Sequence, residues 1–194
     1  EARGLDARGL VTDASRPTTR KTRIATTRNQ QVARVDRELG DDLAATVEDA
    51  LVAVLDTAAA TAGAIVVSDY LKGVVTSRVM RHVVATARAR AVPLLVDPKV
   101  PHMPLYAGAT LLTPNHHEAE SASHVRIRTA QEAQRAAAVL RETLRVDGVL
   151  VTLGEQGMWL SHETSDGHLP AIAREVSDVT GAGDTVVATL AVAM

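Results

Sequence analysis

The strongest chemical signal in the chain is a glycine-rich turn that carries a carboxylate and leads into an apolar segment. Gly181-Ala182-Gly183-Asp184 follows Asp178-Val179-Thr180, and residues 185–194 have the composition of a helix. Small residues at a helix start let backbone N–H groups approach an anion closely, and the helix dipole favours negative charge there. A carboxylate beside a bound anion is repelled unless it has a chemical task, such as accepting the proton of an attacking hydroxyl. The turn therefore indicates either phosphoryl transfer with Asp184 as base or a helix start with a solvated aspartate.

Two more polar motifs occur upstream of this turn. Asn115-His116-His117-Glu118 has the residue types of a nucleotide or metal site, and it also has those of a helix cap. The adjacent histidines His116 and His117 are expected to point apart into solvent and not to share a metal ion. Thr152-Leu153-Gly154-Glu155-Gln156-Gly157 is a second glycine-containing turn. The chain has no Gly-x-x-x-x-Gly-Lys-Ser/Thr loop and no Gly-x-Gly-x-x-Gly fingerprint, so these motifs belong to neither of those phosphate-binding classes.

Short apolar strands alternate with amphipathic helices over most of the chain, which predicts an α/β fold with a mostly parallel sheet covered by helices on both faces. One helix is expected over 43–55 after a cap at Asp41-Asp42, and another opens with the capping box Thr129-Ala130-Gln131-Glu132 and runs to about Arg145. The remaining expected elements are a helix over 76–91 and strands over 64–68, 93–97, 110–113, 149–152 and 157–160.

Polar residues follow these strands where each one ends. They are Ser68-Asp69, Asp97-Pro98-Lys99, Thr113-Pro114-Asn115 and Thr152-Leu153-Gly154. The carboxyl ends of parallel strands meet along one edge of a sheet, and ligands bind beyond that edge. We expect the chemistry there, although Asp69, Lys72 and Lys99 are equally compatible with purely structural roles.

Before the α/β region, residues 21–26 and 31–36 have β character and are joined by the turn 27–30. Their alternation of apolar and polar residues is incomplete, which predicts a flat, partly exposed hairpin.

Composition sets the broader limits. With 194 residues, 46% apolar and 23% charged, the chain fits one globular domain with a real core. A net charge of -2 gives no reason to expect nucleic acid as a partner, and no apolar run reaches the roughly 18 residues of a membrane span. The absence of cysteine fits the cytoplasm.

The ends of the chain suggest a further expectation. The chain begins with Glu1, and the run from 185 to 194 ends without a cap. We interpret it as an internal piece of a longer protein.

The motif from Asp178 to Asp184, together with Asn115–Glu118 and Thr152–Gly157 in that order along the chain, resembles the PfkB/ribokinase family of carbohydrate kinases. Thr189 stands where that family usually has Ala or Gly. The resemblance implies a ribokinase-like fold, ATP as donor, Mg²⁺, and Asp184 as the base. It further implies that the backbone of Gly181, Ala182 and Gly183 stabilises the transferred group, that Asn115 and Glu118 hold the metal through water, and that the nucleotide site includes Asn115, His116, His117, Glu118, Thr152, Gly154 and Gly157.

Four further segments resemble one branch of this family, the kinases of D-glycero-β-D-manno-heptose 7-phosphate: 28–31, 68–73, 97–99 and 111–115. That branch phosphorylates the anomeric hydroxyl on the route to ADP-heptose. The resemblance implies a lid formed by about residues 16–40, a homodimer as a possible assembly, and a fused nucleotidyltransferase domain as a possible extension of the parent protein. It also implies substrate contacts from Arg28, Asn29, Gln30, Asp69, Lys72 and Lys99.

The Gly-Gly motif that contacts the sugar near the start of this family's fold has no counterpart in the chain. We therefore expect an incomplete ribokinase-like domain over 1–194, lacking parts at both ends and poorly active alone. Two alternatives stay open, namely a kinase of the same family acting on another sugar or a nucleoside, and a nucleotide-binding module of the same fold without turnover.

Overall fold

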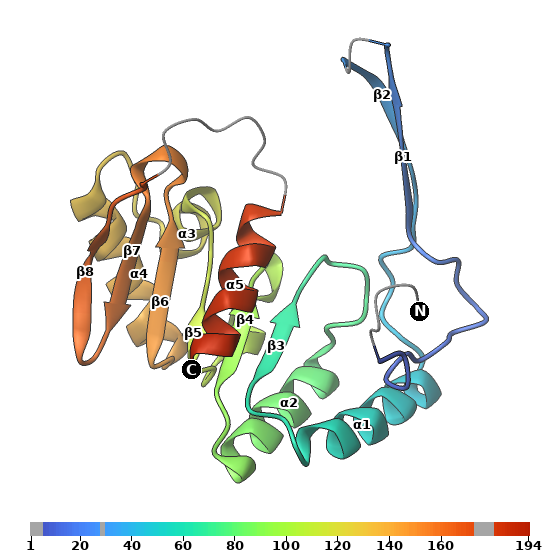
Figure 1. Ribbon diagram of the computed structural model, residues 1–194. Coiled ribbons are helices and arrows are strands. Elements are labelled where there is room, and N and C mark those ends of the chain that lie inside the picture. The colour runs from blue at the N-terminus through green and yellow to red at the C-terminus, as the bar shows by residue number, and fades with distance from the viewer. Residues whose placement is uncertain (1–5, 28–29, 173–180) are drawn as a thin grey trace.

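The computed structural model describes residues 6–27, 30–172 and 181–194. Within these residues, six strands form one sheet in the order β3-β4-β5-β6-β7-β8 (Figure 1). Their bounds are Ile65–Ser68, Leu94–Asp97, Leu111–Leu112, Gly148–Thr152, Met158–His162 and Ser165–Leu169. Strands β3 to β6 pair in parallel, while β7 and β8 are antiparallel additions. The expected mostly parallel sheet is confirmed, and the antiparallel strand β8 was not anticipated.

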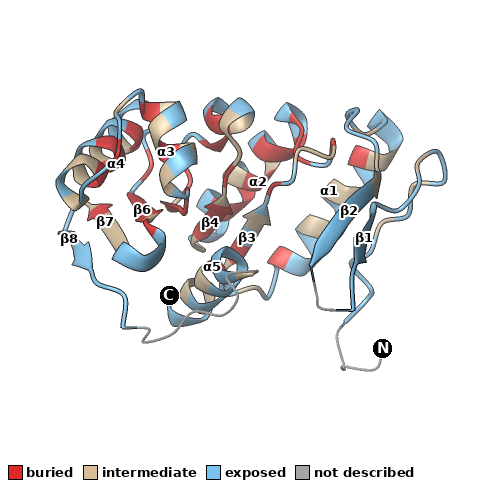
Figure 2. Cartoon of the chain, turned by 90° about the horizontal axis from the view of Figure 1, so that it is seen from above, coloured by how far each residue is buried: buried red, intermediate tan, exposed pale blue. Residues whose placement is uncertain are grey.

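Helices cover both faces of this sheet, as expected. Helices α1 (Ala45–Ala59), α2 (Ser77–Arg90), α3 (His116–Ser123) and α4 (Ala130–Leu144) lie on one side, and α5 (Ala182–Ala193) lies on the other (Figure 1). Successive strand residues alternate between the two layers, because Leu94 and Val96 join the larger core cluster whereas Leu95 packs with Val187 of α5. Figure 2 shows the buried residues concentrated between the strands and the four-helix side.

The starts of α2 and α4 follow the capping rules, whereas the start of α1 does not. Thr76 accepts a hydrogen bond from the N–H of Val79 at the start of α2, and Thr129 forms the expected capping box with Glu132. The expected cap at Asp41-Asp42 is wrong, because α1 begins at Ala45 with Ala44 at its N-cap and no side-chain cap. Gly73 explains the displaced start, since its close approach to the backbone of Asp41 holds that segment against the loop after β3.

Two shorter elements shape the edge of the sheet. The 3₁₀ helix η1 (Val100–Tyr106) follows directly after β4 and Lys99, and the sequence pattern gave no sign of it. A one-turn helix η2 (Gly154–Gln156) closes the turn between β6 and β7.

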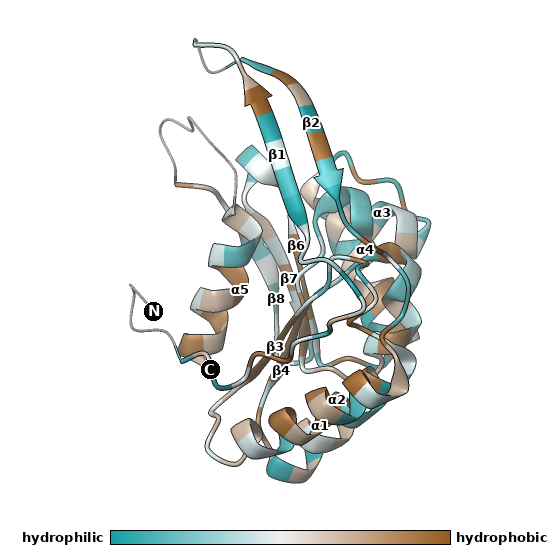
Figure 3. Cartoon of the chain, turned by 90° about the vertical axis from the view of Figure 1, so that its right-hand side faces the viewer, coloured by the Kyte–Doolittle hydropathy of each residue, from teal (hydrophilic) through white to brown (hydrophobic). Residues whose placement is uncertain are grey.

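The hairpin is a separate two-stranded sheet of β1 (Arg20–Ala25) and β2 (Gln31–Arg37) that projects away from the core (Figure 1). It is more exposed than expected, since Asp36 is the one strand residue in it that is even partly buried. Figure 3 shows apolar segments on both strands beside strongly polar ones. The exposed apolar side chains Ile24 and Val35 belong to these segments.

None of the helices within the described part of the chain is long and apolar enough to cross a membrane.

Candidate active site

The carboxyl ends of the four parallel strands meet along one edge, as the sequence predicts. The backbone N–H of Asp69 donates to the carbonyl of Asp97 over 3.1 Å, which joins the ends of β3 and β4. Asn115 and Thr152 form an isolated parallel bridge, and the N–H of Thr152 donates to the carbonyl of Pro114 over 3.0 Å. Two motifs that are 37 residues apart in the sequence thereby become neighbours.

The glycine-rich turn reaches the same edge from the opposite face. Gly181 takes the left-handed conformation (φ +79°) at the N-cap of α5, and Asp184 lies in the first turn of that helix. The Tyr70 hydroxyl, just beyond β3, donates to Oδ1 of Asp184 over 3.2 Å. Residues 173–180, which include Asp178-Val179-Thr180, lie outside the described residues.

The described residues give no packing reason for glycine at position 183. Among them, a Cβ added there would meet nothing within 4 Å, and at Gly181 it would meet only Oδ2 of Asp184 at 4.0 Å. Glycine inside a helix costs about 1 kcal/mol relative to alanine, so an uncrowded glycine in the first turn of α5 needs another explanation. Open space above unpaired first-turn N–H groups is the arrangement that an anion requires.

Lys99 and three carboxylates share this edge. Lys99 Nζ pairs with Oε1 of Glu118, and although burial opposes its charge, this carboxylate holds the pKa of Lys99 above its ordinary value. Burial raises the pKa of Asp97, and the negative charges of Glu118 and Asp184 raise it further while Lys99 opposes the rise. Negative charge therefore exceeds positive charge among these four groups, which is a setting suited to a cation.

The motif Asn115–Glu118 is a helix cap in this structure. The Asn115 side chain accepts from the N–H of Glu118, and the Glu118 carboxylate accepts from the N–H of Asn115, each over 3.0 Å. The expectation that the adjacent histidines point apart is wrong, because the rings of His116 and His117 lie 3.8 Å apart between centroids, tilted by 41°. The described residues contain no group of three or more potential metal ligands.

The metal implied by the resemblance is compatible with this cap through water only. The two Glu118 oxygens and Oδ1 of Asn115 each already accept one hydrogen bond or ion pair, but carboxylate and amide oxygens have further lone pairs for water. Magnesium usually keeps several of its waters, so Asn115 and Glu118 fit a hydrated Mg²⁺.

The two glycines of the 152–157 turn have different structural reasons. Gly157 (φ +87°) is buried, and a Cβ there would approach the carbonyl oxygen of Leu169 to 2.1 Å and the backbone nitrogen of Ala171 to 2.6 Å. Gly154 (φ +60°) is exposed, and a Cβ there would meet none of the described residues within 4 Å. Gly157 is therefore required by packing, whereas Gly154 leaves open space beside the end of β6.

This difference predicts unequal costs for two matched substitutions. We expect Gly157→Ala to lower the free energy of unfolding by at least about 2 kcal/mol, because it combines a strained backbone with overlap of fixed backbone atoms. Gly154→Ala adds the same methyl group in a left-handed conformation without overlap and should cost about 1 kcal/mol. Urea unfolding of both variants measures the difference, and equal costs would contradict this account of Gly157.

Asp69 is buried and fully engaged. One oxygen accepts from the N–H of Leu71 over 2.8 Å, and the other lies 2.6 Å from both the Tyr106 hydroxyl and Nδ1 of His102. Burial and the Asp69 carboxylate raise the pKa of Tyr106. Asp69 has 1% of its surface exposed and fixes η1 against the loop after β3, and its predicted contact with the substrate stays a prediction.

Lys72 connects that loop to the base of the hairpin. Its Nζ lies 2.5 Å from Oε1 of Glu38, and Lys21 lies 3.6 Å from the other oxygen of the same carboxylate. Lys72, then Lys21, keeps the pKa of Glu38 below its ordinary value. Gln30 stands at the exposed hairpin tip, where its carbonyl accepts from the N–H of Thr26 over 2.8 Å, and Arg28 and Asn29 lie outside the described residues.

Three residues of the edge were not predicted from the sequence: Tyr70, His102 and Tyr106. Tyr70 stands inside the segment 68–73, and the resemblance of that segment was the one available signal for it. His102 and Tyr106 join the edge only because η1 folds back onto Asp69.

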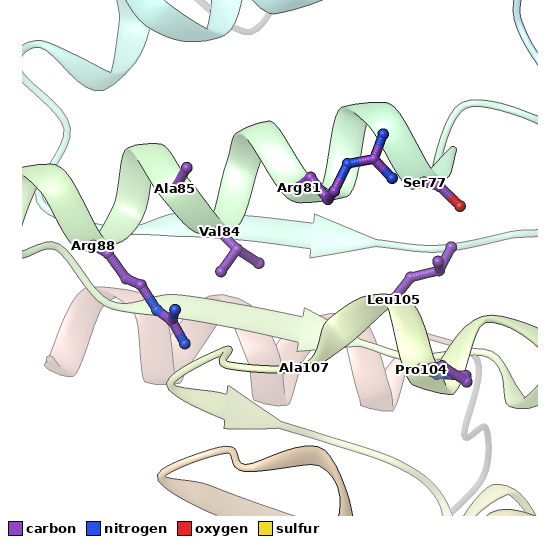
Figure 4. A pocket seen from close by; sticks show the side chains of 8 residues that line it. All are labelled: Ser77, Arg81, Val84, Ala85, Arg88, Pro104, Leu105 and Ala107. Atoms are coloured by element: carbon purple, nitrogen blue, oxygen red, sulfur yellow. The ribbon is translucent and has the colours of Figure 1, made fainter.

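A cavity of about 500 Å³ lies elsewhere, between α2 and η1 (Figure 4). Arg81 and Arg88 from α2 and Pro104 and Leu105 from η1 help to line it. None of the predicted site residues contributes to it, so the candidate site remains the edge that Asp184 faces.

Solved structures share this fold. Arabidopsis thaliana ribokinase, described as complexed with ribose and ATP, matches with a TM-score of 0.67 and 22% identity over 92% of this chain and 56% of that chain. The structure titled Sa239 matches with a TM-score of 0.75 and 20% identity over 96% of this chain and 59% of that one. The fold is therefore ribokinase-like.

The family model for "pfkB family carbohydrate kinase" matches residues 1–194. The chain therefore belongs to the pfkB family of carbohydrate kinases. It is similar to the bifunctional protein HldE of Geotalea uraniireducens, with 45% identity over 99% of this chain and 39% of that protein. The bifunctional protein HldE of Azorhizobium caulinodans is 44% identical over 98% of this chain and 40% of that protein. The chain thus spans about two fifths of the length of these relatives.

Proposed function

We propose that the protein containing this chain transfers the γ-phosphoryl group of ATP to the anomeric hydroxyl of D-glycero-β-D-manno-heptose 7-phosphate. The observation that carries the proposal is the placement of Asp184 in the open first turn of α5, facing the strand ends that hold Asp97, Lys99 and Glu118. Phosphoryl transfer to a hydroxyl needs a base, a helix start that can bind an anion, and carboxylates that can attract a metal cation. This edge of the sheet provides residues for each of these tasks.

In the proposed reaction, Asp184 accepts the proton of the sugar hydroxyl as the hydroxyl oxygen attacks the γ-phosphorus. The bond from this phosphorus to the ADP oxygen breaks as the new bond forms. The first-turn N–H groups around Gly181, Ala182 and Gly183 stabilise the charge on the transferred group. Asn115 and Glu118 would hold a hydrated Mg²⁺, which neutralises phosphate charge when it is bound. Thr152 and Gly154, beside Asn115, border the space assigned to the nucleotide.

Lys72 and the hairpin support the lid interpretation. Lys72, in the loop after β3, pairs with Glu38, which directly follows β2. This ion pair links a movement of that loop to a movement of the hairpin. Lid closure over the substrates would exclude water and so limit hydrolysis of ATP. The exposed apolar side chains of the hairpin, Ile24 and Val35 among them, suit a second copy of the chain, and we include a homodimer in the proposal.

The choice of acceptor rests on resemblance and on the relatives. The segments 28–31, 68–73, 97–99 and 111–115 resemble the heptose-phosphate branch, and the HldE relatives are named bifunctional and are longer than this chain. A nucleotidyltransferase domain in the same protein would use the product on the route to ADP-heptose. Use of ATP as donor places this chemistry in the cytoplasm.

A coupled assay for ADP tests the function in the full-length protein. We expect turnover with D-glycero-β-D-manno-heptose 7-phosphate to exceed turnover with ribose, fructose 6-phosphate and adenosine by at least about 100-fold in kcat/KM, because a site that hydrogen-bonds the groups of one acceptor rejects analogues that leave its polar groups unpaired. Higher activity with another acceptor would move the protein to another branch of the family. ATP binding without ADP release on any acceptor would instead support a binding module without turnover.

A further inference from the structure

The loop after β3 directs consecutive side chains to different parts of the site. Ser68 Oγ donates to the Asp97 carboxylate over 3.4 Å, and Asp69 holds Tyr106. Tyr70 reaches Asp184, and Lys72 reaches Glu38. One short segment therefore contacts the strand-end carboxylate, the 3₁₀ helix η1, the proposed base and the lid.

The backbone of this loop is held in one conformation. Leu71 has a left-handed backbone (φ +54°), which is strained for a leucine, and its N–H donates to the buried Asp69 carboxylate. Gly73 (φ +75°) packs so closely on Asp41 that an added Cβ would lie 1.7 Å from its carbonyl oxygen. Tyr70 stands between Asp69 and Leu71, so the fixed backbone of the loop sets the direction of its side chain.

Packing does not account for the side chain of Tyr70. The residue is 55% exposed, whereas Tyr106 is fully buried. The Tyr70 hydroxyl is the one hydrogen-bond partner that the described residues provide for the Asp184 side chain, and it contacts Oδ1. Among the described residues no donor contacts Oδ2 of Asp184, which lies on the side of Gly181, where an added Cβ would only just reach it.

We propose that Tyr70 is a positioning residue for the base. Its hydroxyl donates a hydrogen bond to Oδ1 of Asp184, which fixes the plane of the carboxylate and leaves Oδ2 to accept the proton of the sugar hydroxyl. Tyr70 keeps its own proton throughout, since the proton released from the acceptor oxygen goes to Oδ2 as the bond from oxygen to phosphorus forms. This inference rests on the proposed function, because it assigns Tyr70 a role only if Asp184 is the base.

The test is Tyr70→Phe in the full-length protein, assayed with whichever acceptor supports turnover. We expect kcat to fall about tenfold, because one hydrogen bond that aligns a charged catalytic group is lost. The KM values for ATP and for the sugar should stay within about twofold, since the ring remains and the proposal assigns the hydroxyl to Asp184 and to neither substrate. Thermal unfolding should be nearly unchanged for a side chain this exposed.

A double-mutant cycle with Asp184→Asn separates positioning from a general structural effect. If Tyr70 acts through Asp184, Tyr70→Phe should have little further effect on the residual rate of the Asp184→Asn enzyme. An unchanged kcat in Tyr70→Phe, a change confined to KM, or the same tenfold loss in the Asp184→Asn background would each overturn the proposal. A wild-type protein without turnover on any acceptor would instead refute the proposed function itself.

Discussion

Replacing Asp184 by asparagine is expected to lower kcat by at least about 1000-fold while the affinity for ATP changes by less than about threefold. The amide has nearly the same shape and still accepts the Tyr70 hydrogen bond at its oxygen, so the first turn of α5 should keep its geometry. It cannot take up the acceptor proton, and general-base catalysis typically contributes 100- to 10,000-fold. Single-turnover kinetics with the full-length protein and calorimetric titration of ATP measure the two quantities separately.

Asp147→Asn is a matched control for this substitution. Asp147 is exposed and stands before β6, at the amino end of that strand and away from the carboxyl edge. Its replacement removes the same charge and should leave kcat within about twofold of wild type. An Asp184→Asn enzyme that keeps more than a tenth of wild-type kcat would remove Asp184 from the role of base.

The sequence could predict the sheet and its helices because their signals are local. Apolar runs such as 93–97 form buried parallel strands, and Thr129 with Glu132 forms the capping box that its spacing indicates. The alignment of polar strand ends on one edge followed from parallel topology alone. These features depend on neighbours within a few residues or on a general rule for α/β sheets.

The sequence prediction is wrong or incomplete where contacts between residues far apart in the chain determine the local structure. Asp41-Asp42 looks like a cap, but Gly73 contacts Asp41, and α1 begins at Ala45, two residues later than expected. The hydrogen bonds of the Asp69 carboxylate could not be predicted, because they join it to His102 and to Tyr106, which is 37 positions away. Tyr70 could not be assigned from the sequence, since its partner is 114 residues away and only the fold brings the two together.

The cap at Asn115–Glu118 shows how a structural and a functional interpretation combine. The capping hydrogen bonds hold the Glu118 carboxylate in one orientation at the end of β5, and in that orientation Oε1 meets Lys99. The helix cap thus positions Glu118 beside Lys99, the cation that lies among Asp97, Glu118 and Asp184. The hydrogen bonds of Asn115 and Glu118 are those of a helix cap, and the cap belongs to the candidate site because Glu118 also contacts Lys99.

Lys99→Met is the second substitution with a large expected effect. Lys99 is the cation that balances Glu118 and opposes the negative charges acting on Asp97. Without it, three carboxylates face the incoming triphosphate, so ATP is repelled and charge developing in the transition state loses a stabilising partner. We expect kcat/KM for ATP to fall by about 100- to 1000-fold, and Lys99→Arg to recover only part of this loss, because a planar guanidinium does not replace a compact ammonium group.

The chain offers a close control for Lys99→Met. Arg135 lies 3.9 Å from Glu132, which, like Glu118, is the third residue of a helix with a capping box, but this pair lies on the exposed surface of α4. Arg135→Met removes a positive charge beside an equivalent glutamate and should change kcat/KM by less than about twofold, since exposed ion pairs contribute little. Steady-state kinetics with ATP as the varied substrate compares the variants. Equal effects of the two substitutions would show that Lys99 acts as an ordinary surface charge and not as the cation of the active site.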